Sequence, residues 1–171
     1  DHGTNMARGT TATLGKLDAT IPLGAMFKSV GMALVSTVGG SAGPLYGTFF
    51  MKFGAKLGDV EDVSLNTFAA ALKAGRDGVV ARGKAAVGEK TMIDAMTPAV
   101  EAFDSHVGDS PLAAAEAALA AAQQGRDATI PLVAKKGRAS YLGERSAGHQ
   151  DPGATSTAYL FEALVAAVKE G

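Results

Sequence analysis

The chain has 171 residues, a formal net charge of −1 and a hydrophobic fraction of 47%. This length is typical of one domain with a substantial core, so we expect a single domain over residues 1–171. The nearly balanced charge argues against the broad positive field of nucleic-acid-binding proteins, and the absence of cysteine excludes disulfides, thiolate zinc sites and thiol nucleophiles.

Apolar residues recur at helical spacing along most of the chain, and no convincing strand pattern occurs between them. The pattern predicts helices over residues 5–17, 22–38, 45–57, 65–83, 91–107, 112–135 and 151–169. Three helix starts are marked by capping residues, because a side-chain oxygen can accept a free N–H group and proline suits the first helical position. These starts are Ser64, Ser110-Pro111 and Asp151-Pro152.

Alanine and glycine dominate the composition, which suits helices that approach one another closely. Gly75, Gly78 and Gly83 interrupt the apolar stripe of the helix over 65–83, so this helix is expected to be bent or very tightly packed. Pro131 is expected to disturb the helix over 112–135. The pattern as a whole predicts an all-α fold, an antiparallel helical bundle.

A polar stretch, GRASYLGERSAGHQDPGATS at Gly137–Ser156, separates the last two predicted helices. A loop this rich in glycine and hydrogen-bond donors is usually either disordered or wrapped around a polar ligand. The apolar residues Tyr141 and Leu142 and the helix start at Asp151-Pro152 favour the second alternative. A helix N-terminus beside a basic, glycine-rich loop predicts a phosphate site.

Most of this stretch, with three other segments in order, resembles the nucleotide-binding L subunit or L domain of dihydroxyacetone kinases. The other segments are DHGTNMARG at Asp1–Gly9, VGGSAGPLYGTFF at Val38–Phe50 and ARGKAAVGEKTMIDA at Ala81–Ala95. The resemblance covers essentially the whole chain. It implies an antiparallel up-and-down helical barrel with the nucleotide at one rim, and the first helix of that fold is expected to be missing before Asp1.

The resemblance also implies a magnesium site at the start of the chain. Members of the family hold two Mg²⁺ ions with three aspartates, and only the last of these matches a residue here, Asp1. Carboxylates suit this hard cation, but one carboxylate leaves the site incomplete in this chain. His2, Gly3, Thr4 and Asn5 match positions that contact the nucleotide, and Asn5 is also expected to cap or open the first helix.

A glycine-rich turn over residues 39–43 joins two predicted helices. It is no P-loop, since no lysine follows at the required place, and its residues alone indicate a simple helix connection. The resemblance implies that Ser41 and Ala42 line the nucleotide.

Gly83, Thr91 and Met92 form a third candidate segment. A methionine is more often core filler than a ligand contact. The resemblance implies instead that the glycine and the methionine approach the adenine or ribose, because glycine permits a flat base to lie against the backbone.

Arg138 is the predicted catalytic residue and also a predicted nucleotide contact. An arginine can pair with phosphate through two parallel hydrogen bonds, and phosphoryl transfer depends mainly on positioning and charge neutralisation. Without the resemblance, Arg138 would be interpreted as a surface arginine in a solvated loop. Asp151, Pro152 and Gly153 match a further turn that contacts the nucleotide in the family.

The resemblance implies an ADP- or ATP-binding subunit that transfers a phosphoryl group to dihydroxyacetone held on a separate K subunit. This glycerone-kinase-type phosphotransferase would act only with its partner, and the chain as it stands could be inactive. The phosphoryl donor is either exchangeable ATP or a phosphotransferase-system protein that rephosphorylates bound ADP. Alternatives are a nucleotide-binding regulatory or scaffold module without transfer activity, and a kinase domain for another acceptor such as fatty acid.

Other partners follow from composition. We expect neither nucleic acid nor membrane as a partner, because the charge is nearly balanced and no apolar run reaches the length of a membrane span. A cytoplasmic location is expected, and a homodimer is left open.

Overall fold

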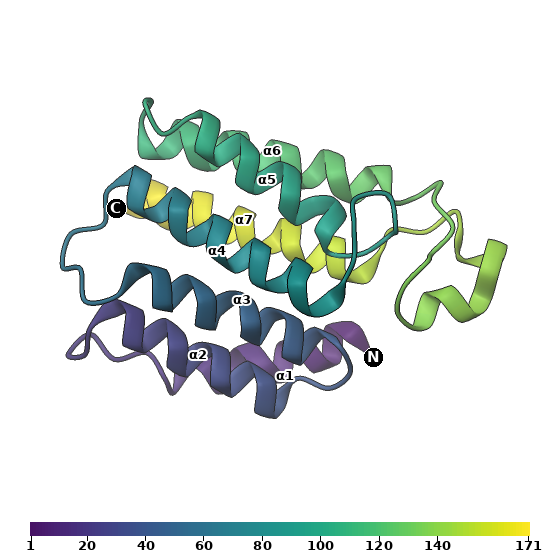
Figure 1. Cartoon of the computed structure of the whole chain (residues 1–171), viewed down its shortest axis with the longest axis horizontal. Coiled ribbons are helices and arrows are strands. Elements are labelled where there is room, and N and C mark those ends of the chain that lie inside the picture. Colours follow the sequence, from purple (N-terminus) through teal and green to yellow (C-terminus); the bar gives the residue numbers. More distant parts are fainter. The chain divides into compact units, whose positions relative to one another are not determined.

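The computed structural model describes residues 1–171 as seven α-helices and one 3₁₀-helix, without a strand (Figure 1). In chain order they are α1 (His2–Leu14), α2 (Leu23–Thr37), α3 (Ala42–Leu57), α4 (Leu65–Gly83), α5 (Ile93–Ser105), α6 (Pro111–Ala128), η1 (Arg138–Ser146) and α7 (Pro152–Glu170). The all-α prediction is confirmed. No helix combines the length and apolar character that crossing a bilayer requires. The chain divides into two compact units, residues 1–84 and 85–171, and the prediction of a single domain stays a prediction.

In the first unit, α2 and α3 pack backbone against backbone because glycines occupy facing positions. Gly24 and Gly31 lie seven residues apart on α2, and Gly47 and Gly54 have the same spacing on α3. A Cβ atom added to Gly31 would lie 2.6 Å from the carbonyl oxygen of Gly47, and one added to Gly54 would lie 2.5 Å from that of Gly24. The facing pairs run in opposite directions, so the two helices are antiparallel.

Aromatic side chains fill the space between α2, α3 and α4. Phe27 and Phe53 meet edge to face with ring centroids 4.8 Å apart, and Phe53 and Phe68 do so at 5.3 Å. A Cβ atom added to Gly75 of α4 would lie 2.6 Å from the ring of Phe49. Of the two alternatives for the glycines of this helix, the structure thus shows tight packing at Gly75.

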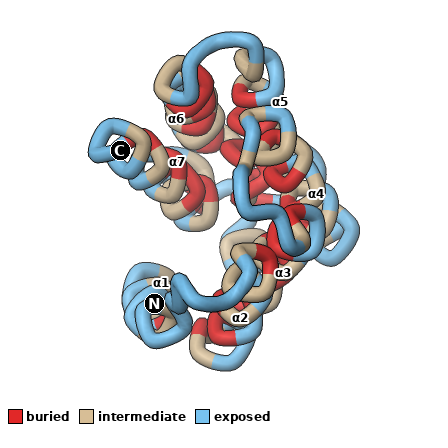
Figure 2. The backbone as a smooth tube through the Cα atoms, turned by 90° about the vertical axis from the view of Figure 1, so that its left-hand side faces the viewer, coloured by how far each residue is buried: buried red, intermediate tan, exposed pale blue.

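The second unit contains α5, α6 and α7, whose buried sides face one another (Figure 2). Gly125 lies where α6 crosses α5, since an added Cβ atom would collide with the carbonyl oxygen of Asp94. Small residues let these helices approach closely and still exclude water. The fully buried alanines that line this core are Ala95, Ala99, Ala114, Ala115, Ala118, Ala122 and Ala154.

All three predicted helix caps are confirmed. Ser64 Oγ accepts the backbone N–H of Thr67 at 3.1 Å at the start of α4. Ser110 Oγ accepts that of Ala113 at 3.1 Å, with proline in the first turn of α6. The cap of α7 is the carboxylate of Asp151, with proline again in the first turn.

The structure differs from the prediction at the end of α6 and in the polar stretch that follows it. The helix predicted over 112–135 ends at Ala128, because Pro131 has no N–H group to continue it and disfavours helical backbone in the residue before it. The stretch Gly137–Ser156 is not simply a loop, since Arg138–Ser146 forms η1, which changes direction at Gly143, where φ is +55°.

Two helices, α1 and α3, begin three residues earlier than the sequence pattern predicts. α1 begins at His2, so Asn5 lies inside the helix; Asp1 takes the N-cap position, and the prediction that Asn5 caps the helix is wrong. α3 begins at Ala42 and includes Pro44 in its first turn, where a missing N–H group costs nothing.

Candidate functional site

The predicted site residues at the start of the chain lie on the first turns of α1. Asp1, Gly3 and Thr4 are exposed, whereas His2 and Asn5 are partly buried. Burial lowers the pKa of His2, which favours the neutral imidazole. This side chain is therefore suited to a hydrogen bond with a ligand rather than to an ion pair.

The structure brings Asn5 next to the glycine-rich turn that follows α2. A Cβ atom added to Gly39 would lie 3.2 Å from the side-chain nitrogen of Asn5. Arg8, which sequence reasoning did not single out, connects the two segments: its Nε donates to the carbonyl oxygen of Thr37 at 3.0 Å and its Nη2 donates to Asn5 Oδ1 at 2.8 Å. Its position within the DHGTNMARG segment was the available signal.

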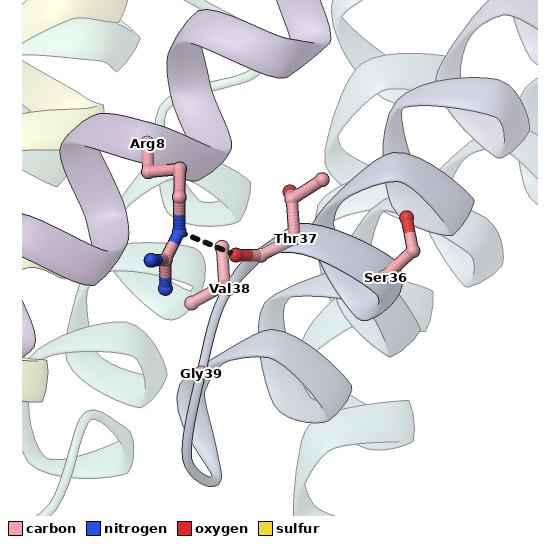
Figure 3. A pocket seen from close by; sticks show the side chains of 5 residues that line it. All are labelled: Arg8, Ser36, Thr37, Val38 and Gly39. Atoms are coloured by element: carbon pink, nitrogen blue, oxygen red, sulfur yellow. Dashed lines mark hydrogen bonds between the residues drawn. The ribbon is translucent and has the colours of Figure 1, made fainter.

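Arg8 also lines an open cavity of about 460 Å³ at the end of α2 (Figure 3). The other lining residues belong to the end of this helix and the turn after it: Ser36, Thr37, Val38 and Gly39. The first two predicted segments thus lie side by side within the first unit.

Ser41, Ala42 and Gly83 are placed differently from one another. Ser41 is exposed at the N-cap position of α3, although its side chain does not cap the helix. Ala42 is buried, so a ligand would reach its backbone more readily than its methyl group. Gly83 ends α4, and an added Cβ atom would lie 3.2 Å from Leu45 Cδ2. Gly83 therefore packs closely against a leucine of α3.

The second unit brings together the predicted residues of the 91–92 and 151–153 segments. A Cβ atom added to Gly153 would lie 3.3 Å from both the Cβ and the backbone nitrogen of Met92, so the start of α7 lies against the start of α5. Met92 is buried, Thr91 is partly buried, and Pro152 is exposed. The Thr91 hydroxyl oxygen accepts the N–H of Ile93 at 3.1 Å.

The carboxylate of Asp151 satisfies the helix start on which it stands. Its Oδ2 accepts the N–H of Ala154 at 2.8 Å, and its own N–H donates to the Thr129 hydroxyl at 2.9 Å. Asp151 is 8% exposed. The phosphate site predicted at this helix N-terminus stays a prediction, and one of the free N–H groups there already has the Asp151 carboxylate as its acceptor.

Two buried charged residues of the ARGKAAVGEKTMIDA segment were missed. Asp94 accepts the N–H of Gly88 at 2.6 Å and that of Thr91 at 2.7 Å, and so shapes the turn before α5. Lys90, in the same turn, is 3% exposed. Both residues lie in a segment that resembles the family, which could have drawn attention to them. Their burial could not be predicted from the spacing of residues in the sequence.

Arg138 is exposed in the first turn of η1, directly after Gly137, where φ is +67°. Figure 1 shows η1, in yellow-green, beyond the ends of α6 and α7. Ser146 fixes the far end of η1, since its hydroxyl accepts the N–H of Ala134 at 2.9 Å and donates to the carbonyl oxygen of Gly143 at 2.6 Å. The segment that carries Arg138 is thus an ordered structure with its own internal contacts.

The residues present do not make up a two-magnesium site. Residues 1–171 contain no group of three or more histidine, aspartate or glutamate side chains placed to hold a metal ion. Asp1 alone supplies one carboxylate, whereas the resemblance implies three.

A pH-dependent effect on stability is expected from Asp151. Burial, and to a smaller extent the charge of Asp94, raises its pKa, while the Ala154 N–H and the Lys90 charge act in the opposite direction. A carboxyl group with a raised folded-state pKa binds more protons folded than unfolded, so its contribution to stability falls as pH rises from about 3.8 through the folded pKa.

Asp151→Asn keeps the cap and removes this titration, so the variant should gain stability relative to the wild type as pH rises through that window. Asp151→Ala should lower the free energy of unfolding at neutral pH by about 1 kcal/mol, the usual value of a lost N-cap. Urea unfolding between acid and neutral pH measures both effects. A constant difference between Asp151→Asn and the wild type would contradict the raised pKa.

The chain is similar to known proteins over nearly its whole length. The DAK2 domain model matches residues 1–166. The chain is 44% identical over 174 residues to the ADP-binding subunit DhaL of the PEP-dependent dihydroxyacetone kinase of Escherichia coli (strain K12), and the match covers 99% of this chain and 83% of that subunit. It is 46% identical over 167 residues to the ADP-binding subunit of PEP-dependent dihydroxyacetone kinase 1 of Listeria innocua. This match covers 96% of this chain and 79% of that subunit.

Among solved structures, the dihydroxyacetone kinase from C. freundii in complex with AMP-PNP and Mg²⁺ is similar, with a TM-score of 0.62 and 32% sequence identity. The likeness covers 85% of this chain and 23% of that one, so the chain spans about a quarter of that kinase. It confirms the helical fold class, and together with the sequence matches it shows that the chain belongs to the DAK2 domain family.

Proposed function

We propose that this chain is the ADP-binding subunit of a dihydroxyacetone kinase and transfers a phosphoryl group to dihydroxyacetone held on a partner K subunit. The observation that carries the proposal is the match, at 44% and 46% identity, to two ADP-binding subunits of which the chain covers 83% and 79%. A relative matched over most of its own length supports a common role better than one matched through a fragment. A cytoplasmic location stays a prediction.

Each unit contains segments that we propose as nucleotide contacts. In the first unit the candidates are His2, Gly3, Thr4, Asn5, Ser41, Ala42 and Gly83. In the second unit they are Thr91, Met92, Arg138, Asp151, Pro152 and Gly153. The contact between Asn5 and Gly39 and that between Met92 and Gly153 support the proposal, since each joins segments that the resemblance assigns to one ligand.

The two ends of the nucleotide would meet different chemistry in the second unit. Asp151 and Asp94 are both buried carboxylates of this unit, and negative charge on them disfavours phosphate nearby. Met92 is an apolar side chain packed against the half-buried backbone of Gly153, a combination that suits a base or a ribose better than a phosphate. Arg138 keeps its positive charge and is exposed, so its guanidinium group suits the phosphates.

We assign the PEP-dependent version to this chain rather than the version that uses exchangeable ATP. Both ADP-binding subunits named above belong to PEP-dependent kinases. In the PEP-dependent version the kinase needs no nucleotide exchange, because bound ADP would be rephosphorylated in place by a phosphotransferase-system protein.

Reconstitution tests the proposal. The natural protein that contains residues 1–171 is mixed with a K subunit, dihydroxyacetone, Mg²⁺ and ADP, and either ATP or PEP with the phosphotransferase proteins is added. We expect dihydroxyacetone phosphate to form with PEP and catalytic amounts of ADP, and calorimetry to show ADP binding that depends on Mg²⁺. Binding without transfer to any acceptor would favour the regulatory or scaffold module, and transfer to a fatty acid alone would favour the other kinase class.

A further inference from the structure

Lys90 occupies a central position in the second unit. Its Nζ donates to the carbonyl oxygens of His149 at 2.6 Å, Thr129 at 2.8 Å and Leu132 at 3.1 Å, and approaches that of Ile130 at 3.5 Å. These acceptors lie on both sides of η1 in the chain, at its approach and at its exit. One ammonium group therefore holds together both ends of the segment that carries Arg138.

Other contacts close the same segment, but none reaches as many of its residues. The N–H of Gly148 donates to the carbonyl oxygen of Ile130 at 2.7 Å, and that of Lys135 donates to the carbonyl oxygen of Glu89 at 3.1 Å. Without the Lys90 ammonium, the carbonyls of His149 and Leu132 would each lose a charged donor at a part-buried position. Hydrogen bonds to charged groups contribute more than neutral ones, roughly 1.5–3 kcal/mol.

Lys90 has a backbone conformation that is unfavourable for a residue with a side chain, although its side chain reaches these carbonyls. Its φ is +63°, in the left-handed region, which costs a non-glycine residue about 1 kcal/mol or more. Asp94 holds this conformation through the N–H groups of Gly88 and Thr91 on either side. Glycine would relieve the backbone cost, but it would remove the ammonium group.

General stability alone is a weak reason for this arrangement. Taking an ammonium group out of water is expensive, and apolar residues of similar volume often stabilise a protein as well or better. The ammonium group binds carbonyls from two separate parts of the chain at one point. This is a means of fixing the shape of the segment between them.

We infer that Lys90 is a positioning residue, a built-in cation that fixes the segment over residues 129–149 and thereby holds Arg138 in place for phosphoryl transfer. The inference rests on the proposed function for the role of Arg138, but the ordering of the segment by Lys90 can be measured without it.

Three variants test it in the full-length protein. Lys90→Met keeps most of the side-chain volume and removes the charge; Lys90→Arg keeps the charge; and Lys135→Met removes an exposed lysine of the same segment as a matched control. Hydrogen exchange in the absence of nucleotide should show lost protection at the Ala134 and Gly148 amides in Lys90→Met, with the amides of α5 and α6 unchanged.

Kinetics separates positioning from binding. In the reconstituted system Lys90→Met should lower kcat by about tenfold to a hundredfold, as expected when a catalytic group moves by about an ångström, while KM for the partner proteins changes little. Lys90→Arg should recover part of the loss, and Lys135→Met should match the wild type.

Chemical rescue gives a second, independent readout. Lys90→Ala leaves space beside the same carbonyls, and added propylammonium should restore amide protection and part of the turnover, whereas propanol should not. If Lys90→Met does not fold, Lys90→Ala is prepared with propylammonium present. The inference would be overturned if amide protection in Lys90→Ala did not depend on the amine.

The inference is also wrong if Lys90→Met keeps wild-type turnover and segment protection, or if protection falls equally across α5, α6 and α7. A wild-type protein that neither binds ADP nor transfers phosphate would instead refute the proposed function. Segment protection would still decide whether Lys90 orders residues 129–149.

Discussion

Arg138→Ala is expected to lower the turnover of the reconstituted kinase by about a hundredfold or more, the scale of losing one strong charge-stabilising donor. If the guanidinium group neutralises charge on the phosphoryl group in transit, it contributes more in the transition state than in the bound nucleotide. Nucleotide affinity should therefore fall much less than turnover. Steady-state kinetics with the K subunit and calorimetry with ADP measure the two quantities.

Two further variants interpret the result. Arg138→Lys should rescue only part of the loss, because an ammonium group keeps the charge but lacks the planar pair of donors. Arg145→Ala removes an exposed arginine from the other end of η1 and should act mainly through stability. Normal turnover in Arg138→Ala, or a loss that vanishes at saturating nucleotide, would show that Arg138 is at most a binding residue.

Gly31→Ala is expected to destabilise the protein by about 2–3 kcal/mol, near the upper end for overpacking. The added methyl group would lie 2.6 Å from both the Gly47 carbonyl oxygen and Met51 Cγ, so α2 and α3 would have to separate. The better helix propensity of alanine, worth up to about 1 kcal/mol, offsets only part of this cost. Urea unfolding measures the free-energy difference.

Gly3→Ala is the matched control, because Gly3 is also helical and an added Cβ atom there would meet nothing within 4 Å. It should leave stability unchanged or raise it slightly through helix propensity. If both variants change the free energy of unfolding equally, the close approach of α2 and α3 at Gly31 does not limit side-chain size.

Local sequence patterns were enough to predict the helices and where several of them begin. Ser64, Ser110 and Asp151 each cap a helix as predicted, because a cap depends on residues only three positions away. The same local character explains the errors: α6 ends at Ala128 because of Pro131, but apolar spacing alone continued beyond it. The ordered motifs also sufficed to identify the family, since they are spread along the chain from Asp1 to the start of α7, and the family model matches residues 1–166.

The contacts that support the candidate site depend on how distant parts of the chain pack together. The carbonyls that Lys90 binds lie 39 to 59 residues away in the chain, and no spacing rule connects a lysine with backbone atoms at such distances. The Asp151 cap could likewise be predicted from local sequence, whereas the burial of Asp151 and the packing of the start of α7 against the start of α5 could not. Periodicity records which residues are apolar over a few turns of helix; which buried polar groups meet depends on how helices pack, and that is fixed by contacts between segments far apart in the chain.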